Sequence, residues 1–261
     1  MKLCRFVLNQ APDQARSGIY HEGKVYETDG ERAIGIHEPG SVSLLPPLGT
    51  PPGIRVFEFH RATVGDRALS YRFQNTTGLY GPNSDVEIIS ASTAVDFDVH
   101  VVGTVADTAQ AVDPGEAPSF ALGYGLMLVF YDADMAQDER TQSIPIGPSH
   151  DLGCVIGPYL TTPEDLTEFT VGSDPTNFAW NLSMKVNETA VAKASVEPGI
   201  AFSDLLSFVT RIRTVQAGEV LAWPAFDKPA LEDSPLGRGL VAEDRVEVTV
   251  DGLGTLVARI A

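Results

Sequence analysis

The stretch VDFDVHVVG, residues 95–103, carries three side chains that can do chemistry. Apolar and polar residues alternate along it and several are β-branched, which predicts a β-strand. Side chains two apart on a strand share a face, so Asp96, Asp98 and His100 are expected to project together. Two carboxylates and an imidazole on one face suit general acid–base catalysis or the binding of a metal ion.

The elements around this strand are predicted to be mostly short strands. The 24 glycines and 18 prolines are scattered along 261 residues, which favours turns over long helices. One helix is expected over residues 203–215, where Ser203 can cap the N-terminus and apolar residues recur at helical spacing. Residues 18–28 are predicted to form a hairpin that turns at Glu22-Gly23. Further strands are expected near residues 2–8, 68–74, 123–130, 167–172, 178–186, 218–223, 245–250 and 254–260. This pattern indicates a β-rich α+β fold.

The Pro- and Gly-rich stretch LLPPLGTPPG (44–53) is typical of a connector. We therefore divide the chain into a small N-terminal β subdomain with its connector, residues 1–53, and a main domain, residues 54–261.

Composition narrows the class of protein. The chain has 35 acidic and 18 basic residues, a net charge of −17, which argues against a nucleic-acid or membrane partner because both require clustered Lys and Arg. Cys4 and Cys154 are too few and too far apart for a disulfide framework or a zinc site, so a reducing cytoplasm is expected. The opening MKLCRFVLNQ has Arg5 inside its apolar stretch, which is unlike a signal peptide.

Several segments follow one another in an order typical of one family. They are TGLYGPNSDVEI, VDFDVHVVG, LGYGLMLVFYDADMAQ, GPSHDLGCVIGPYLTTPEDL, FSDLLSFVTRIRTVQAGEVL and DRVEVTVDGLGTLVARI. On the basis of these segments and their order, residues 54–261 resemble members of the fumarylacetoacetate hydrolase superfamily. The resemblance implies a mixed β-sheet rolled around a single helix, a homodimer and a divalent cation, commonly Mg²⁺. It also implies activity on 2-oxo acids or 1,3-dicarbonyl compounds, by carbon–carbon hydrolysis, decarboxylation, isomerisation or dehydration.

The residues that the resemblance would place at the metal have changed. The two glutamates of the family's D-Y-E-V-E-L strand fall on Asp98 and His100, and its third carboxylate falls on Val129. The lysines of its G-K-S-x-D and F-L-K-P segments fall on Pro148 and Gln74. Mg²⁺ prefers oxygen ligands, whereas imidazole suits Zn, Ni, Cu or Fe. We therefore expect the usual Mg²⁺ site to be weak or lost, with Asp98 and His100 as the remaining ligands, and a softer metal as the alternative.

Three histidines border the pocket that the resemblance implies. His60 falls where family members use a histidine as a base, without the glutamate usual beside it; a packed or surface histidine is the alternative. His100 is expected to move a proton with Asp98, whose carboxylate can orient the ring and raise its pKa. A buried hydrogen bond between them is the alternative. His150 precedes Asp151, which matches the family's aspartate, although PSHD is also a reasonable turn.

Substrate contacts are expected from four residues near these histidines. Arg72 or backbone N–H groups are candidates to stabilise an enolate oxygen, although a strand arginine is often only a surface charge. Gln74, His150 and Asp151 are the other expected substrate-binding residues.

Three readings remain open. The first is a diverged, Mg-independent enzyme of the superfamily, and the second is a catalytically inactive binding or scaffold protein. The third is a transition-metal enzyme with a third ligand beside Asp98 and His100. An open pocket lined by the three histidines favours an enzyme, whereas a pocket filled by Trp223, Phe226 or Tyr131 favours a scaffold.

Overall fold

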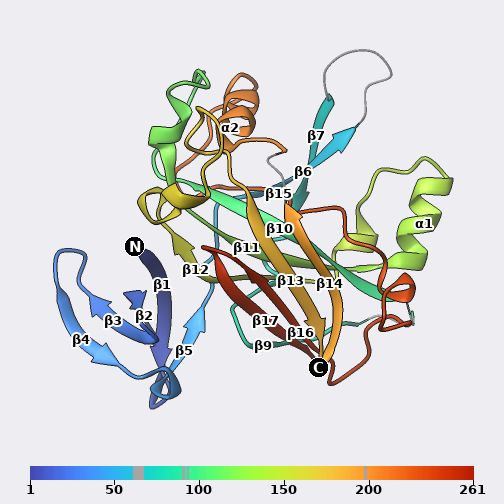
Figure 1. Cartoon of the computed structure of the whole chain (residues 1–261), viewed down its shortest axis with the longest axis horizontal. Helices are drawn as coiled ribbons and strands as arrows, with labels where there is room; N and C mark the ends of the chain where they lie inside the picture. Colours follow the sequence, from blue (N-terminus) through green and yellow to red (C-terminus); the bar gives the residue numbers. More distant parts are fainter. Residues whose placement is uncertain (61–67, 90–91, 93, 197–198) are drawn as a thin grey trace.

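Two β-sheets and two short α-helices make up the described chain (Figure 1). The computed structural model describes all residues except 61–67, 90–91, 93 and 197–198, and the side chains of Phe59, His60 and Ala68 are also outside the described part. The larger sheet has the order β4-β3-β2-β1-β12-β11-β10-β15-β6-β7, with β5 paired to β1 and β8 to β12. The smaller sheet has the order β14-β13-β16-β17-β9.

The strands of the larger sheet are β1 (Lys2–Leu8), β2 (Ala11–His21), β3 (Lys24–Thr28), β4 (Ala33–His37), β5 (Val42–Leu45), β6 (Ile54–His60), β7 (Ala68–Gln74), β8 (Leu79–Tyr80), β10 (Val95–Val105), β11 (Ala121–Asp132), β12 (Cys154–Thr161) and β15 (Val220–Pro224). Those of the smaller sheet are β9 (Ser84–Val86), β13 (Trp180–Val186), β14 (Thr189–Val196), β16 (Arg245–Val250) and β17 (Gly254–Ile260). The α-helices are α1 (Ala133–Thr141) and α2 (Phe202–Thr210), and the short 3₁₀ helices are η1 (Pro39–Ser41), η2 (Ala117–Phe120), η3 (Pro148–His150), η4 (Pro163–Phe169) and η5 (Leu231–Asp233).

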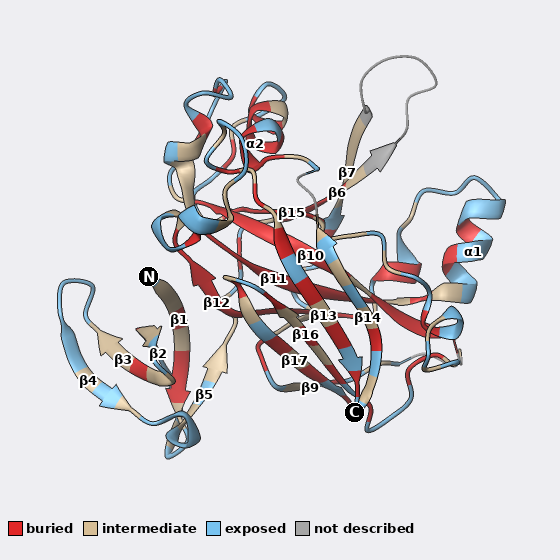
Figure 2. Cartoon of the chain, viewed as in Figure 1, coloured by how far each residue is buried: buried red, intermediate tan, exposed pale blue. Residues whose placement is uncertain are grey.

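Strand β10 lies at the centre of the larger sheet and carries the VDFDVHVVG sequence. It pairs antiparallel with β11 and β15, so both of its edges are covered. Phe97, Val99 and Val101 on one face are buried in the main core, as alternation predicts. Figure 2 shows that buried residues predominate along β10, β11, β12 and β15. Asp96, Asp98 and His100 therefore project from a rigid, central element.

Helix α2 packs on this central region. Phe202 contacts the ring of Tyr124 at 5.8 Å, in an edge-on arrangement, and α2 buries Leu205, Leu206 and Val209. A Cβ at Gly103 would overlap the Phe202 ring, so glycine on β10 permits the close approach of the helix. Burial of these side chains supplies the main driving force for docking α2.

The N-terminal strands extend the larger sheet. Lys2 and Leu3 of β1 pair with Thr161 and Leu160 of β12, which joins the residues before the connector to the rest. The predicted hairpin at residues 18–28 is confirmed: its turn residues Glu22 and Gly23 have φ values of 48° and 79°.

The β-rich fold with few helices is confirmed, with several local differences. Helix α1 was not predicted, because only Ala136 and Glu139 of its nine residues are buried and no apolar periodicity marks it. Strand β12 was missed because its Gly157-Pro158 pair is unusual in a strand, and the strand predicted at 167–172 is wrong, since η4 covers its first residues. Helix α2 ends at Thr210, before the predicted end at residue 215.

A further difference is the cap of α2. Ala201 is the N-cap residue, whereas Ser203 lies inside the helix and donates its hydroxyl hydrogen to Asp174. Among the described residues, the helices are all too short or too polar to cross a membrane.

Candidate functional site

Asp98 and His100 differ in exposure although they share a face of β10. The side chain of Asp98 is 41% exposed, whereas His100 is 4% exposed. His100 Nδ1 is buried and has no hydrogen-bond partner among the described residues. Leaving a buried polar atom unpaired costs free energy, so this nitrogen is available to a ligand that reaches it.

Asp98 faces His150, and His150 is the end of a chain of polar contacts. Asp98 Oδ2 lies 3.7 Å from His150 Nε2. His150 Nδ1 lies 2.7 Å from Ser149 Oγ, and Ser149 Oγ donates to Glu139 Oε2 over 2.5 Å. Ser149 N also donates to Glu139 Oε1. Helix α1 supplies Glu139 and η3 supplies the other two residues, so both short helices are positioned to hold the imidazole beside β10.

The Glu139–Ser149–His150 contacts fix the protonation of the ring. The single hydroxyl hydrogen of Ser149 goes to the Glu139 carboxylate, so Ser149 Oγ accepts the Nδ1–H of His150. His150 Nε2 then holds a lone pair when the ring is neutral. The ring of Tyr131 stacks on that of His150, with centroids 4.7 Å apart and planes 5° apart, which further restrains its orientation.

His100 and Asp98 differ in their charge at neutral pH. Burial lowers the pKa of His100 to about 4; the Asp98 carboxylate opposes this shift, while Arg72 and His150 add to it. Burial raises the pKa of Asp98, but contacts with His150 and the proximity of His100 and Lys228 outweigh it, so the pKa lies below its ordinary value. At neutral pH, therefore, Asp98 is ionised and His100 is neutral. The pKa increase expected for His100 from its neighbouring carboxylate is outweighed by burial.

Arg72 and Gln74 lie on β7 and line the same cavity as His150. Arg72 Nη1 donates to Gln74 Oε1 over 2.5 Å, and Gln74 Nε2 donates to the His150 carbonyl over 3.1 Å. Arg72 also lies 3.9 Å from Glu58, and burial lowers its pKa. Gln74 thus links the guanidinium to the segment that bears His150.

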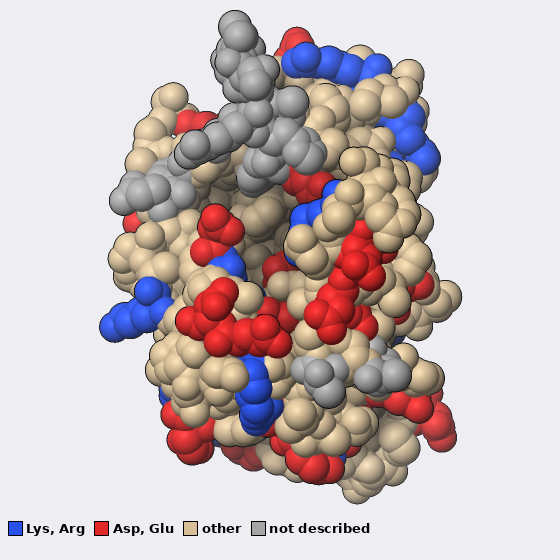
Figure 3. Space-filling view, turned by 90° about the vertical axis from the view of Figure 1, so that its right-hand side faces the viewer, with Lys and Arg blue, Asp and Glu red and all other residues tan. Residues whose placement is uncertain are grey.

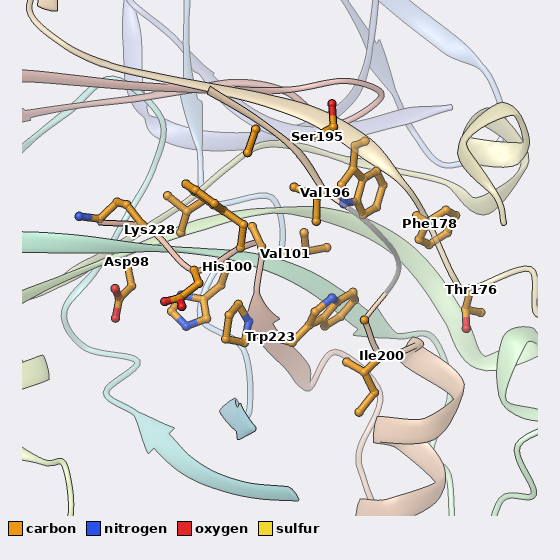
Figure 4. A pocket seen from close by; sticks show the side chains of 18 residues that line it. Asp98, His100, Val101, Thr176, Phe178, Ser195, Val196, Ile200, Trp223 and Lys228 are labelled. Atoms are coloured by element: carbon orange, nitrogen blue, oxygen red, sulfur yellow. The ribbon is translucent and has the colours of Figure 1, made fainter. Parts of the chain in front are cut away.

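Two cavities border this cluster. The larger, of 790 Å³, contains Asp98 and His100 in its wall together with Lys228 and several aromatic residues (Figure 4). In that view Asp98 and Lys228 lie at one end, and Phe178 and Thr176 at the other. The smaller, of 530 Å³, is lined by residues of β7 and of the segment around η3, among them Arg72, Gln74, His150 and Asp151. Figure 3 shows acidic side chains gathered around a hollow on the face that lies at the right of Figure 1.

The structure brings together most of the predicted site residues. Asp98, His100, His150, Arg72 and Gln74 form one cluster, and Asp151 is exposed beside the smaller cavity. His60 ends β6, but its side chain lies outside the described residues. Trp223 and Phe226 line the larger cavity without filling it.

Sequence reasoning missed three residues that shape this region. Glu139 and Ser149 orient His150, and Tyr131, considered above only as a residue that could fill the pocket, stacks on it. Lys228, from the segment after β15, forms an ion pair of 2.8 Å with Asp96. The face shared by Asp96 and Asp98 was a signal for a cation, but nothing local indicated which of the 18 basic residues would supply it.

The residues present do not match the donors that Mg²⁺ prefers. Asp98 is one carboxylate, His100 is an imidazole, and Val129, directly opposite Asp98 in the β10–β11 register, is fully buried and apolar. Within the described part of the chain, no group of three His, Cys, Asp or Glu side chains converges in a way that could hold a metal ion.

Comparisons with known proteins agree with the fold. Residues 61–261 match the family model described as fumarylacetoacetate (FAA) hydrolase C-terminal. The chain is 26% identical over 180 residues to the 2,4-didehydro-3-deoxy-L-rhamnonate hydrolase of Sphingomonas sp. (strain SKA58), covering 69% of this chain and 60% of that protein. The match therefore spans less than two thirds of that relative. This chain is also 24% identical over 182 residues to an uncharacterized protein of Pyrococcus abyssi, and the match covers 69% of this chain and 74% of that protein.

Solved structures give the same result over the whole chain. The 2-hydroxyhepta-2,4-diene-1,7-dioate isomerase from Mycobacterium marinum has a TM-score of 0.75 at 19% identity, covering 100% of this chain and 98% of that one. The fumarylacetoacetate hydrolase from Exiguobacterium antarcticum has a TM-score of 0.75 at 20% identity, covering 100% and 99%. At these identities the likeness establishes the fold.

Proposed function

Since the chain belongs to the fumarylacetoacetate hydrolase family, we propose that it is a diverged enzyme acting on a small 2-oxo acid or 1,3-dicarbonyl compound. The reaction would be a carbon–carbon hydrolysis, decarboxylation, isomerisation or dehydration carried out by acid–base chemistry. Relatives named as hydrolases and isomerases of small acids support this class. The observation that carries the proposal is the Asp98–His150 pair, in which the carboxylate lines the larger cavity and the oriented imidazole lines the smaller one.

His150 is the proposed proton acceptor. Its Nδ1–H is held by Ser149, which leaves the Nε2 lone pair directed toward Asp98 and the reacting region. The 3.7 Å gap between Nε2 and Asp98 Oδ2 is longer than a hydrogen bond, so a substrate proton could be exchanged with either atom. Asp98, ionised at neutral pH, would then stabilise the protonated imidazole.

Arg72 is the proposed stabiliser of negative charge on the substrate. Removing a proton next to a carbonyl group moves charge onto the carbonyl oxygen, which requires a preorganised cation or N–H donor. The partly buried Arg72 lies close enough to Asp98 for that carboxylate to oppose the lowering of its pKa by burial, and Gln74 positions the guanidinium. Neutral His100 can add a hydrogen bond through its unpaired Nδ1.

We also propose that this chemistry proceeds without the Mg²⁺ usual in the family. Support comes from the donor set, in which a buried valine lies opposite Asp98 and an imidazole replaces a second carboxylate. A transition metal bound through Asp98, His100 and a third ligand is the competing possibility.

One experiment tests activity and metal together. Protein purified without chelator is analysed for metals and assayed with oxaloacetate and acylpyruvates, with and without EDTA; His100→Ala and Asp98→Asn are treated alike. We expect no stoichiometric metal and EDTA-resistant turnover that Asp98→Asn loses. Stoichiometric Mg or Mn would contradict the metal-independent mechanism. Stoichiometric Zn, Ni or Fe that His100→Ala loses would favour the transition-metal alternative.

A catalytically inactive binding or scaffold protein is the second candidate. The stacking of Tyr131 on His150 favours it, because the ring covers one face of the proposed base. Ligand binding by wild-type protein without turnover of any oxo acid in the panel would support it.

We further propose a homodimer in the cytoplasm. The family resemblance supports the dimer, and the two free, buried cysteines, Cys4 and Cys154, are consistent with a reducing compartment. Light scattering at micromolar concentration tests the dimer, and a monomeric mass would exclude it.

A further inference from the structure

The larger cavity exceeds what a small oxo acid needs. Its volume is 790 Å³, roughly five times that of a cavity of about 150 Å³ that holds benzene. Phe178, Trp180, Trp223 and Phe226 line it, together with aliphatic side chains such as Ile200. Asp98 and His100 occupy only part of its wall, and the aromatic and aliphatic side chains share the remainder with polar ones such as Thr176 and Ser195.

The aromatic wall is preformed. The rings of Phe178 and Trp180 stack with centroids 4.9 Å apart, and Tyr124 makes edge contacts with Phe178 at 4.9 Å and with Trp223 at 6.4 Å. Phe178, Trp180 and Trp223 are each 5–6% exposed. Because neighbouring rings already hold these side chains, an apolar ligand would not have to order them on binding.

Charge in the cavity wall selects against an acidic tail. Asp98 and Asp227 contribute carboxylates, and Lys228 is already paired with Asp96, which is outside the lining. Arg72, whose pKa is lowered by burial while the charge of Asp98 opposes this shift, borders the smaller cavity. A ligand with one carboxylate is therefore best placed with that group toward Arg72 and the rest of its length in the aromatic cavity.

We propose that the substrate carries an uncharged apolar group at least as large as one aromatic ring, which binds along Phe178, Trp180 and Trp223. Its oxo-acid or dicarbonyl end lies at Asp98 and His150. This inference rests on the proposed function, whose reacting groups fix the orientation of the ligand.

Intrinsic fluorescence provides a direct measurement. The chain has two tryptophans, Trp180 and Trp223, and both line this cavity. We would titrate wild-type protein with 2-oxobutanoate, with 4-phenyl-2-oxobutanoate, which adds a ring, and with 2-oxohexanedioate, which adds a tail carboxylate. The phenyl compound is expected to bind about ten-fold or more tightly than the other two, because its ring is removed from water.

Cavity-filling variants locate the ring. Ala194→Phe, in the lining, should abolish the preference for the phenyl compound, while Lys193→Phe, exposed on the same strand and outside the lining, should retain it. Circular dichroism checks folding, and Ala194→Leu replaces Ala194→Phe if the larger side chain is not accommodated.

The outcomes separate this inference from the proposed function. Equal affinities for the three compounds, tight binding of 2-oxohexanedioate, or a phenyl preference that survives filling at Ala194 would overturn the inference. Turnover is measured separately with acetylpyruvate and benzoylpyruvate. Tighter binding of the phenyl compound without any turnover would contradict the proposed reaction but support the inferred ligand class. Turnover without tighter binding of the phenyl compound would support the proposed reaction but contradict the inferred ligand class.

Discussion

Asp96 and Asp98 lie two residues apart on the same face of β10, yet their surroundings differ. Asp96 accepts hydrogen bonds from Lys228 Nζ at 2.8 Å, Leu231 N at 2.9 Å and Phe97 N at 2.6 Å, and its side chain is 4% exposed. Asp98 is 41% exposed, and its contact with His150 Nε2 is 3.7 Å long. The first carboxylate is fully bonded within the protein, whereas the second retains free acceptor capacity beside a cavity.

This difference distinguishes a structural carboxylate from a reactive one. A buried ion pair with several donors holds segments together but has no lone pair to offer a ligand. Asp96 ties the segment after β15 to the central strand, because Lys228 and Leu231 both belong to that segment. Asp98 keeps its charge near the cavity, and its carboxylate can still accept hydrogen bonds from a ligand.

The largest expected effect is on catalysis. Asp98→Asn should reduce turnover by about 10²–10⁴-fold, because the charge that supports proton transfer by His150 is removed. The free energy of unfolding should change by less than about 1 kcal/mol, since the side chain is partly exposed. Steady-state rates and urea unfolding measure the two quantities. A variant with full activity would remove Asp98 from the mechanism.

The next effect is on stability, at the neighbouring carboxylate. Lys228→Met should lower the free energy of unfolding by about 3 kcal/mol, because it leaves the Asp96 charge buried without its cation. The value lies at the low end for broken buried pairs because two backbone N–H groups still bond Asp96. Lys193→Met, at an exposed position, is the matched control. Equal stabilities of the two variants in urea would show that the Asp96 pair is not structural.

The polar face of β10 was predictable because strand periodicity is local. Alternation over residues 95–103 was sufficient to place Asp96, Asp98 and His100 on one face, and the family resemblance placed that face in a pocket. Strands β16 and β17 were likewise predicted with their observed bounds, since alternating β-branched residues mark both.

The partners of that face were not predictable because they come from distant or irregular segments. Lys228 is 132 residues from Asp96, and a single lysine in a loop carries no signal of its partner. Glu139 lies in a helix without an apolar stripe, so its burial depends on Ser149 of η3 rather than on periodicity. The low pKa of His100 likewise depends on how deeply the tertiary structure buries the ring, which a sequence pattern does not reveal.

An effect of up to the same size as that of Lys228→Met, reached only at low pH, is expected from His100 as a dependence of the free energy of unfolding on pH. Its pKa is about 4 in the folded protein and 6.5 in its ordinary state, so the unfolded chain binds more protons between these values. The free energy of unfolding should have its full value above pH 6.5 and should fall by up to about 3 kcal/mol as the pH decreases to 4. The difference between wild type and His100→Asn in urea unfolding over this range isolates the contribution. Parallel curves would show that His100 is not buried as described.

The smallest expected effect concerns the orientation of the His150 proton. Glu139→Gln keeps the size of the side chain but gives it an N–H₂ group. If Gln Oε1 accepts from Ser149 N, as Glu139 Oε1 does, then the N–H₂ donates to Ser149 Oγ. The Ser149 hydroxyl would then donate to His150 Nδ1, and the ring proton would move to Nε2, where the proposed base needs its lone pair. We expect kcat to fall about ten-fold with KM unchanged, at the low end of acid–base effects.

Nitrogen-15 NMR of the His150 ring should show the proton on Nδ1 in wild type and on Nε2 in the variant. An unchanged tautomer together with a reduced kcat would mean that Glu139 acts through its charge, and an unchanged kcat would exclude the Glu139–Ser149–His150 chain from catalysis.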